Sequence, residues 1–125
     1  MKILVCGGRD YDDRQIIRDW LMFLQDLVPW ERLEVVHGGA RGADTGAEIC
    51  CRTLGLKTHV HPALWHLYGS KAGPLRNREM LHEHPDIALV LAFPGGRGTE
   101  NMTWQAAARK IPVLRVENSP YGIQV

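Results

Sequence analysis

Three short stretches of the chain pair glycines with an arginine. They are Gly7-Gly8-Arg9, Gly38-Gly39-Ala40-Arg41 and Gly95-Gly96-Arg97. Glycine-rich turns that open a helix present free backbone N–H groups to phosphate and other anions, and a guanidinium adds a charged, two-pronged donor. One such turn is common in α/β proteins, whereas three of the same composition predict a shared anion-binding cleft.

The third turn has the clearest setting. Residues 87–93 are an apolar run that predicts a buried strand, and residues 102–110 predict a helix. Between them, Pro94-Gly95-Gly96-Arg97-Gly98-Thr99 is expected to bind the anion. Thr99 is expected either to cap the helix or to bond a ligand oxygen.

Two other segments add polar candidates. Gly42 and Asp44 complete the second turn, where Asp44 is expected either to cap N–H groups or to contact ribose or base donors of a ligand. Arg76 and Asn77 lie at the start of a helix that Pro74 opens. They are expected either to face an anionic ligand or to form a solvated helix end.

Regular alternation of elements positions these residues. Helices are expected over 12–28, 43–54, 74–84 and 102–110, with an irregular segment over 62–73, and strands over 3–6, 33–37, 57–61, 87–93 and 113–116. This alternation predicts an α/β fold: a Rossmann-like, doubly wound parallel sheet of about five strands with helices on both faces, as a single domain over 1–125. With strand order 3-2-1-4-5, the turns at Gly7 and Pro94 face each other, and the Gly38 turn lies beside them.

Composition narrows the partners. The chain has 125 residues, 45% of them hydrophobic and 23% charged, with a net charge of +1. Nucleic acid is therefore an unlikely partner on bulk charge, and no apolar run is long enough to predict a membrane span. Three cysteines without a disulfide or zinc spacing favour a cytoplasmic location.

Several familiar sites do not fit. The first turn lacks the third glycine of the dinucleotide fingerprint, and no glycine pair precedes the Lys-Ser/Thr of a P-loop. The pairs His59/His61 and His82/His84 have no third ligand at a useful spacing, so solvated or capping histidines are expected, with no metal and no cofactor. His37 is expected to bond either a ligand or a neighbouring carbonyl.

The aromatic residues of the long segment leave two interpretations open. Trp65 and Tyr68 are expected either to stack a base over the cleft or to pack beneath the loop. Cys6 ends a buried strand, which indicates a core residue in place of a nucleophile.

Together, the three glycine turns and Arg76-Asn77-Arg78-Glu79-Met80 resemble the SLOG superfamily. That superfamily includes the LONELY GUY phosphoribohydrolases, DNA-processing protein A and the YspA/YpsA-like branch, which this small chain resembles most. The resemblance implies a Rossmann-like sheet that binds nucleotides or nucleotide-derived ligands at these turns. It also implies homo-oligomers, which are common in the family.

The enzymes of this superfamily cleave the N-glycosidic bond of nucleoside monophosphates. Their motif is P-G-G-x-G-T-x-x-E, with an arginine on the preceding helix four residues before a methionine. Arg76 and Met80 match that pair, but Met102 stands where the glutamate belongs. Glu100 lies two positions earlier, about 200° around the helix.

Three hypotheses follow. The first is binding or sensing of a nucleotide-derived ligand. The second is a nucleotide N-glycosidase-type hydrolase that uses Arg76 with a non-standard acid, one of Glu79, Glu100 or Asp44. The third is single-stranded DNA binding, which the near-neutral charge disfavours.

Overall fold

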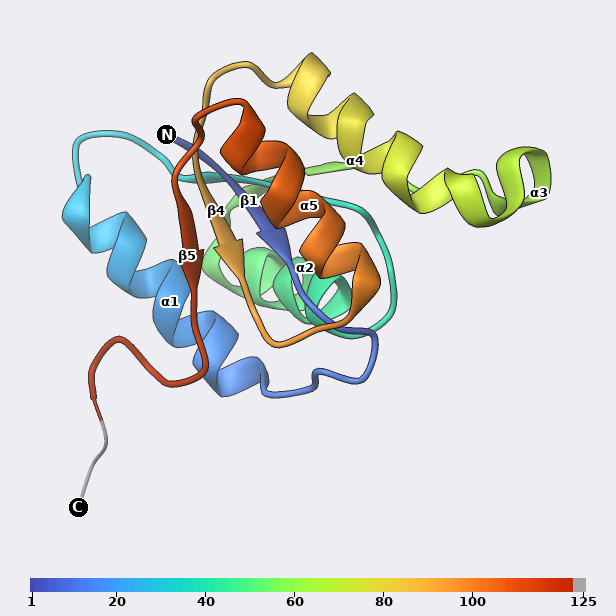
Figure 1. Cartoon of the computed structure of the whole chain (residues 1–125). Coiled ribbons are helices and arrows are strands. Elements are labelled where there is room, and N and C mark those ends of the chain that lie inside the picture. Colours follow the sequence, from blue (N-terminus) through green and yellow to red (C-terminus); the bar gives the residue numbers. More distant parts are fainter. Residues whose placement is uncertain (123–125) are drawn as a thin grey trace.

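Five parallel strands form one sheet in the order β3-β2-β1-β4-β5, as a computed structural model that describes residues 1–122 shows (Figure 1). The fold class predicted from the sequence is confirmed, and the strand order is the one for which the sequence places the glycine turns side by side. The strands are β1 (Lys2–Cys6), β2 (Glu34–His37), β3 (Lys57–Val60), β4 (Ile87–Ala92) and β5 (Val113–Arg115). The order reverses between β1 and β4, where open parallel sheets bind ligands at the carboxyl ends of their strands.

Two pairs of helices cover the two faces of the sheet. They are α1 (Arg14–Leu27) with α2 (Ala43–Leu54), and α4 (Ala72–Glu83) with α5 (Arg97–Ala108). Gly55 ends α2 in the left-handed conformation expected of a C-terminal glycine.

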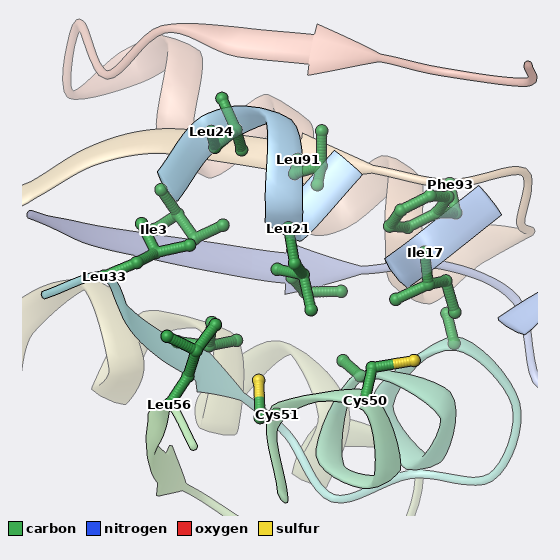
Figure 2. Packing of buried hydrophobic residues seen from close by; sticks show 14 of the residues in the cluster. Ile3, Ile17, Leu21, Leu24, Leu33, Cys50, Cys51, Leu56, Leu91 and Phe93 are labelled. Atoms are coloured by element: carbon green, nitrogen blue, oxygen red, sulfur yellow. The ribbon is translucent and has the colours of Figure 1, made fainter. Parts of the chain in front are cut away.

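Alternate residues of β1 supply the two halves of the core. Ile3 and Val5 pack against Ile17, Leu21 and other residues of α1 and α2, part of which Figure 2 shows. The intervening Leu4 and Cys6 join the cluster under α4 and α5. A strand buried on both faces explains the unbroken apolar run at the start of the chain.

Two predictions about elements were wrong. The segment over 62–73 is not irregular: α3 (Trp65–Tyr68) and a 3₁₀ turn, η1 (Gly69–Lys71), lead directly into α4. Helix α5 begins at Arg97, five residues before Met102. Gly98 in its first turn disfavours a helix by propensity, but burial of Thr99, Met102 and Ala106 outweighs that preference.

The segment after β5 packs back on α1. The indole N–H of Trp20 donates to the carbonyl of Asn118 at 2.8 Å, and the Ser119 hydroxyl donates to Asp19 at 2.9 Å. The expected patternless tail extends to 125, and its residues 123–125 lie outside the described part. None of the helices within residues 1–122 combines the length and hydropathy that crossing a bilayer requires.

Candidate functional site

A cavity of about 870 Å³ opens at the point where the strand order reverses. It is lined by residues that follow three strands and open two helices: 7–11 after β1, Gly38 and Ala40 after β2, parts of 73–77 and the range 94–99. This volume lies in the range of small-molecule sites. The fold thus brings most of the predicted ligand-binding residues to one place.

The turns after β1 and β4 meet at the bottom of this cavity. The Gly8 N–H donates to the Pro94 carbonyl at 2.8 Å. A Cβ at Gly95 would contact the Thr99 hydroxyl and lie 2.6 Å from the Gly8 nitrogen. Glycine is therefore required at Gly95 by the close approach of the two turns.

The N-terminus of α5 borders the cavity without a side-chain cap. Gly96 is its N-cap residue and carries no capping side chain, and Arg97 and Gly98 in the first turn are exposed. A helix N-terminus carries a partial positive charge and free N–H groups. This end of α5 can therefore accept an anion.

Arg76 of α4 also brings a guanidinium to the cavity. Its Nη1 donates to the Gly38 carbonyl at 2.7 Å, and its Nε donates to Asn77 Oδ1 at 3.0 Å. A Cβ at Gly38 would contact the guanidinium, which explains this glycine. Burial lowers the pKa of Arg76, and Asp44 acts against that shift. Arginine remains charged even so.

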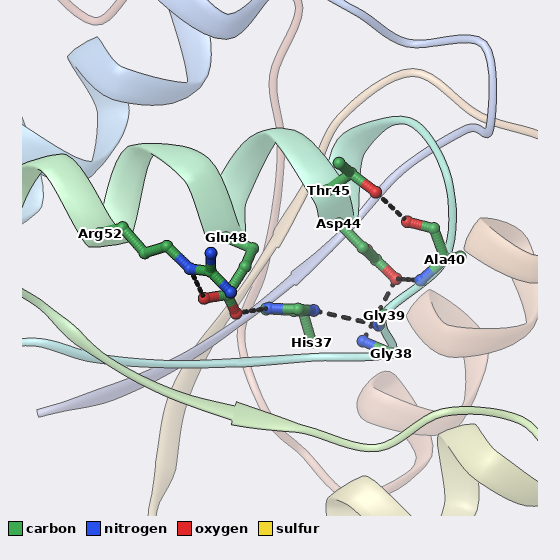
Figure 3. Close-up of polar contacts among 8 residues, drawn as sticks. All are labelled: His37, Gly38, Gly39, Ala40, Asp44, Thr45, Glu48 and Arg52. Carbon is green, nitrogen blue, oxygen red and sulfur yellow. Dashed lines mark hydrogen bonds and ion pairs between the residues drawn. The ribbon is translucent and has the colours of Figure 1, made fainter.

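Asp44 organises the loop after β2, as Figure 3 shows. Its Oδ2 accepts the N–H groups of Gly38 and Ala40, each at 3.2 Å. Burial raises the pKa of this carboxyl, against the effect of those hydrogen bonds. Asp44 also lines the cavity. It therefore both holds the loop after β2 and remains available to contact a ligand.

His37 supports the same loop from inside the fold. Its Nδ1 accepts the Gly39 N–H at 3.0 Å, and its Nε2 contacts Glu48 Oε1 at 2.8 Å (Figure 3). The side chain is fully buried and does not line the cavity. The partners of His37 are thus a backbone N–H and a carboxylate. The part of the chain that the structure describes does not show the hydrogen bond to a neighbouring carbonyl that the sequence suggested as one possibility.

A row of amides ties α4 to α5. Asn77 Nδ2 donates to the Gly98 carbonyl at 3.2 Å and to Asn101 Oδ1 at 3.1 Å, and Gln105 donates to the same oxygen at 2.8 Å. Sequence reasoning found Asn77 but missed Asn101 and Gln105. Their spacing of four residues on one helix was the available signal.

Aromatic residues line the cavity at two places. The Arg9 guanidinium carbon lies 5.3 Å from the ring centroid of Trp65, which is half exposed. Tyr68, three residues after Trp65, does not line the cavity. Tyr11, which sequence reasoning missed, does line it, and its buried hydroxyl has no hydrogen-bond partner within residues 1–122. Burial raises the pKa of Tyr11 to about 12.

Several predicted site residues lie elsewhere. The side chain of Arg41 is 77% exposed and pairs with Asp10. Gly39 and Gly42 have positive φ in the loop after β2 and do not line the cavity. The carboxylate of Glu100 is held by Arg115 at 2.8 Å, outside the cavity. Glu79 likewise does not line it.

A family model for YspA, cpYpsA-related SLOG proteins matches residues 1–68. The Gene 61 protein of Mycobacterium phage D29 is 36% identical to this chain over 126 residues, covering 95% of this chain and 98% of the phage protein. The chain belongs to the YspA, cpYpsA-related SLOG family. The superfamily resemblance drawn from the glycine turns is confirmed.

The X-ray structure of DNA processing protein A from Streptococcus pneumoniae has a similar fold. It superposes with a TM-score of 0.72 and 18% identity over 95% of this chain. The SLOG chain spans about half of that protein, 51% of its length. At this identity the likeness concerns the fold alone.

Met102, which stands where the motif implied by the superfamily resemblance has a glutamate, is part of the core. Met102 is fully buried and packs in the cluster that also holds Leu4, Val36 and Met80. Cys6 belongs to the same cluster and lines the cavity, and burial raises the pKa of its thiol to about 12. Neither residue offers a charged group for glycosidic cleavage.

The histidines are only partly solvated or capping. His84 does end α4, but it is buried, and its Nε2 lies 2.8 Å from Nε2 of His61. His59 contacts Glu34 at 2.8 Å, whereas His82 is exposed. Burial, together with the nearby Lys2, His61 and His59, lowers the pKa of His84.

Proposed function

We propose that the cavity binds a nucleotide or a nucleotide-derived ligand, with its phosphate at the N-terminus of α5. One observation carries the proposal: the uncapped helix end borders the same cavity as the guanidiniums of Arg9, Arg76 and Arg97. Helix N-termini and arginine guanidiniums are the two protein groups best suited to phosphate.

The rest of the cavity suits a nucleoside. Trp65 offers a half-exposed aromatic face on which a base can stack beside Arg9. Both backbone hydrogen bonds to Asp44 go to Oδ2, which leaves Oδ1 to accept a ribose hydroxyl. The unpartnered hydroxyl of Tyr11 supplies one further polar contact.

Binding without cleavage is the function we favour. Cleavage of an N-glycosidic bond needs a carboxylate that stabilises positive charge on the sugar or activates water. Met102 replaces the family enzymes' glutamate, and the carboxylates of Glu79 and Glu100 lie outside the cavity. Of the three acids proposed from sequence, only Asp44 lines it.

Hydrolysis remains the alternative function, since Asp44 and Arg76 share the cavity. It requires release of free base from a nucleoside monophosphate and loss of that release in Asp44→Asn. A complete absence of base across the common monophosphates rejects this alternative and leaves binding as the function.

Single-stranded DNA is a second alternative, because aromatic rings beside arginines also stack and hold oligonucleotides. The structural neighbour is a DNA processing protein. The net charge of +1 offers little attraction for a polyanion. A salt-sensitive gel shift that exceeds mononucleotide binding would favour DNA.

Calorimetry and mass spectrometry test the proposal. We expect small molecules released from the purified protein to include a phosphate-bearing nucleotide derivative, and titration with it to show saturable binding. Arg97→Gln should weaken binding about tenfold through loss of one charge-assisted contact. Arg18→Gln is the matched control, since Arg18 is an exposed residue of α1 that does not line the cavity, and it should leave the affinity unchanged.

Two results would overturn the proposal. One is the absence of binding across mononucleotides, ADP-ribose and cyclic ADP-ribose isomers. The other is an equal loss of affinity in Arg18→Gln and Arg97→Gln, which would show that general surface charge carries the binding.

A further inference from the structure

A second polar cluster lies between β3 and the C-terminal end of α4. His61 follows β3, while Glu83 and His84 end α4. One nitrogen of each imidazole and one carboxylate oxygen lie within 4.8 Å of one another. This arrangement brings together residues 22 and 23 positions apart, which no local sequence spacing indicates.

Burial fixes the two imidazoles, while the acids face solvent. His84 is 8% exposed, and the side chain of His61 is 14% exposed. The side chains of Glu79 and Glu83 are each about half exposed and lie 3.4 and 3.6 Å from His61 Nδ1. Ordered ligands beside an open approach are what a metal ion requires.

We propose that His61, His84 and Glu83 bind a divalent transition-metal ion of the zinc type, with water in the fourth position. Two imidazoles and a carboxylate are a ligand set that Zn²⁺, Co²⁺, Ni²⁺ and Cu²⁺ accept, whereas Mg²⁺ and Ca²⁺ prefer oxygen ligands. Zinc bonds to nitrogen of about 2.0–2.1 Å place two tetrahedral nitrogens about 3.3 Å apart. The two Nε2 atoms, now 2.8 Å apart, need only a small separation, and the exposed Glu83 carboxylate, now 3.6 Å from Nδ1 of His61, must rotate toward them.

Glu79 supports the site from outside. Its Oε1 lies 3.4 Å from Nδ1 of His61, the nitrogen left over when Nε2 binds the ion. A carboxylate on the second nitrogen of a metal-bound histidine fixes the tautomer and makes the ligand more basic.

Lys2 opposes the ion. Its ammonium lies 3.2 Å from Nδ1 of His84 and 3.3 Å from Asp86. A metal on Nε2 requires the proton of neutral His84 to be on Nδ1, where it would face another donor. Lys2 must then turn fully to Asp86. The contact between Lys2 and His84 in the metal-free protein therefore weakens metal binding.

The expected role of the ion is structural. It would join the edge strand β3 to α4, the helix that carries Arg76 and Asn77 of the cavity. A ligand at free concentration c that binds only the folded state stabilises that state by RT ln(1 + c/Kd), so the unfolding temperature should rise with the logarithm of the zinc concentration once the site is saturated.

The test uses full-length protein without a histidine tag, treated with a chelator and titrated with Zn²⁺ against a chromophoric competitor. We expect one equivalent to bind, a rise in unfolding temperature, and with Co²⁺ the visible absorption of tetrahedral nitrogen–oxygen coordination without sulfur bands. His61→Gln and Glu83→Gln should each weaken binding at least tenfold. Lys2→Met should strengthen it several-fold, an effect that damage to the fold cannot mimic.

His82→Gln is the matched control, because His82 lies on the same helix but is exposed and outside the cluster. It should bind as the unaltered protein does, and circular dichroism checks that each variant is folded. Binding that survives in His61→Gln, or falls equally in His82→Gln, overturns the proposal. So does the absence of saturable binding at micromolar zinc in both the unaltered protein and Lys2→Met.

Discussion

At the scale of single residues, Met102 stands where the motif implied by the superfamily resemblance has a glutamate. It is fully buried among apolar neighbours. Met102→Glu would restore the enzymes' motif, yet it places a carboxylate in this cluster. We expect a loss of about 3–5 kcal/mol of stability, as for a buried charge without a partner, and no gain of base release.

Chemical denaturation measures this loss. Met102→Leu is the control, because a swap of similar volume usually costs less than about 1.5 kcal/mol. A Met102→Glu variant as stable as Met102→Leu would show that the position opens to the cavity and can hold a charge.

Asp44 is the residue whose protonation should affect stability. Burial raises its pKa in the folded protein above the unfolded value of about 3.9. The folded state therefore holds this proton more tightly, which adds stability at acid pH that is lost as pH rises through the folded pKa. Asp44→Asn lacks this titration, while its amide oxygen can still accept both backbone N–H groups.

The measurement is urea denaturation of the unaltered protein and Asp44→Asn from pH 4 to pH 8. The free energy of unfolding of the unaltered protein, minus that of the variant, should fall as pH rises. A difference that grows with pH would mean that backbone hydrogen bonds outweigh burial at this carboxylate.

At the scale of elements, the start of α5 links stability with binding. Gly98 is the second residue of this helix, and a Cβ there would meet no atom within 4 Å. Gly98→Ala should therefore stabilise the protein by about 0.4–1 kcal/mol. The same methyl enters the cavity beside the helix N-terminus, so nucleotide affinity should fall.

Gly95→Ala is the contrasting change, since its methyl would press on Thr99 and Gly8. It should destabilise the protein by about 1–3 kcal/mol. Thermal unfolding and calorimetry on both variants separate the two effects. Unchanged affinity in Gly98→Ala would argue that the ligand does not approach this helix end.

These elements show what the sequence could and could not predict. Apolar runs that end in paired glycines located the strands and turns, because burial on both faces and close backbone contacts leave local signals. The early start of α5 was missed because tertiary burial of Thr99 and Met102 overrides glycine propensity. Composition also could not show that Arg97 lines the cavity while Arg41 does not, and instead pairs with Asp10.

The meeting of His61 and His84 was missed for a different reason. It depends on how α4 crosses the sheet, which no spacing within either segment encodes. The side chains that only tertiary packing brings together are therefore the ones for which the structure adds most to the sequence.

At the scale of the whole molecule, the homo-oligomer implied by the family resemblance stays a prediction. The outer face of α4 and α5 carries two large exposed apolar side chains, Trp104 at 72% and Leu75 at 40%. They line a shallow depression of about 470 Å³ with Arg78 and Arg109. Tryptophan and arginine are the residues most enriched where protein interfaces gain their affinity.

We therefore expect self-association through this face. Trp104→Ala should cost about 2 kcal/mol or more, roughly a 30-fold rise in the dissociation constant, in sedimentation analysis. Trp30→Ala is the matched control, because Trp30 is 78% exposed but lies in the loop between α1 and β2. Nucleotide affinity should survive in both variants, since neither tryptophan lines the cavity. An assembly unaffected by Trp104→Ala would place the contact on another face.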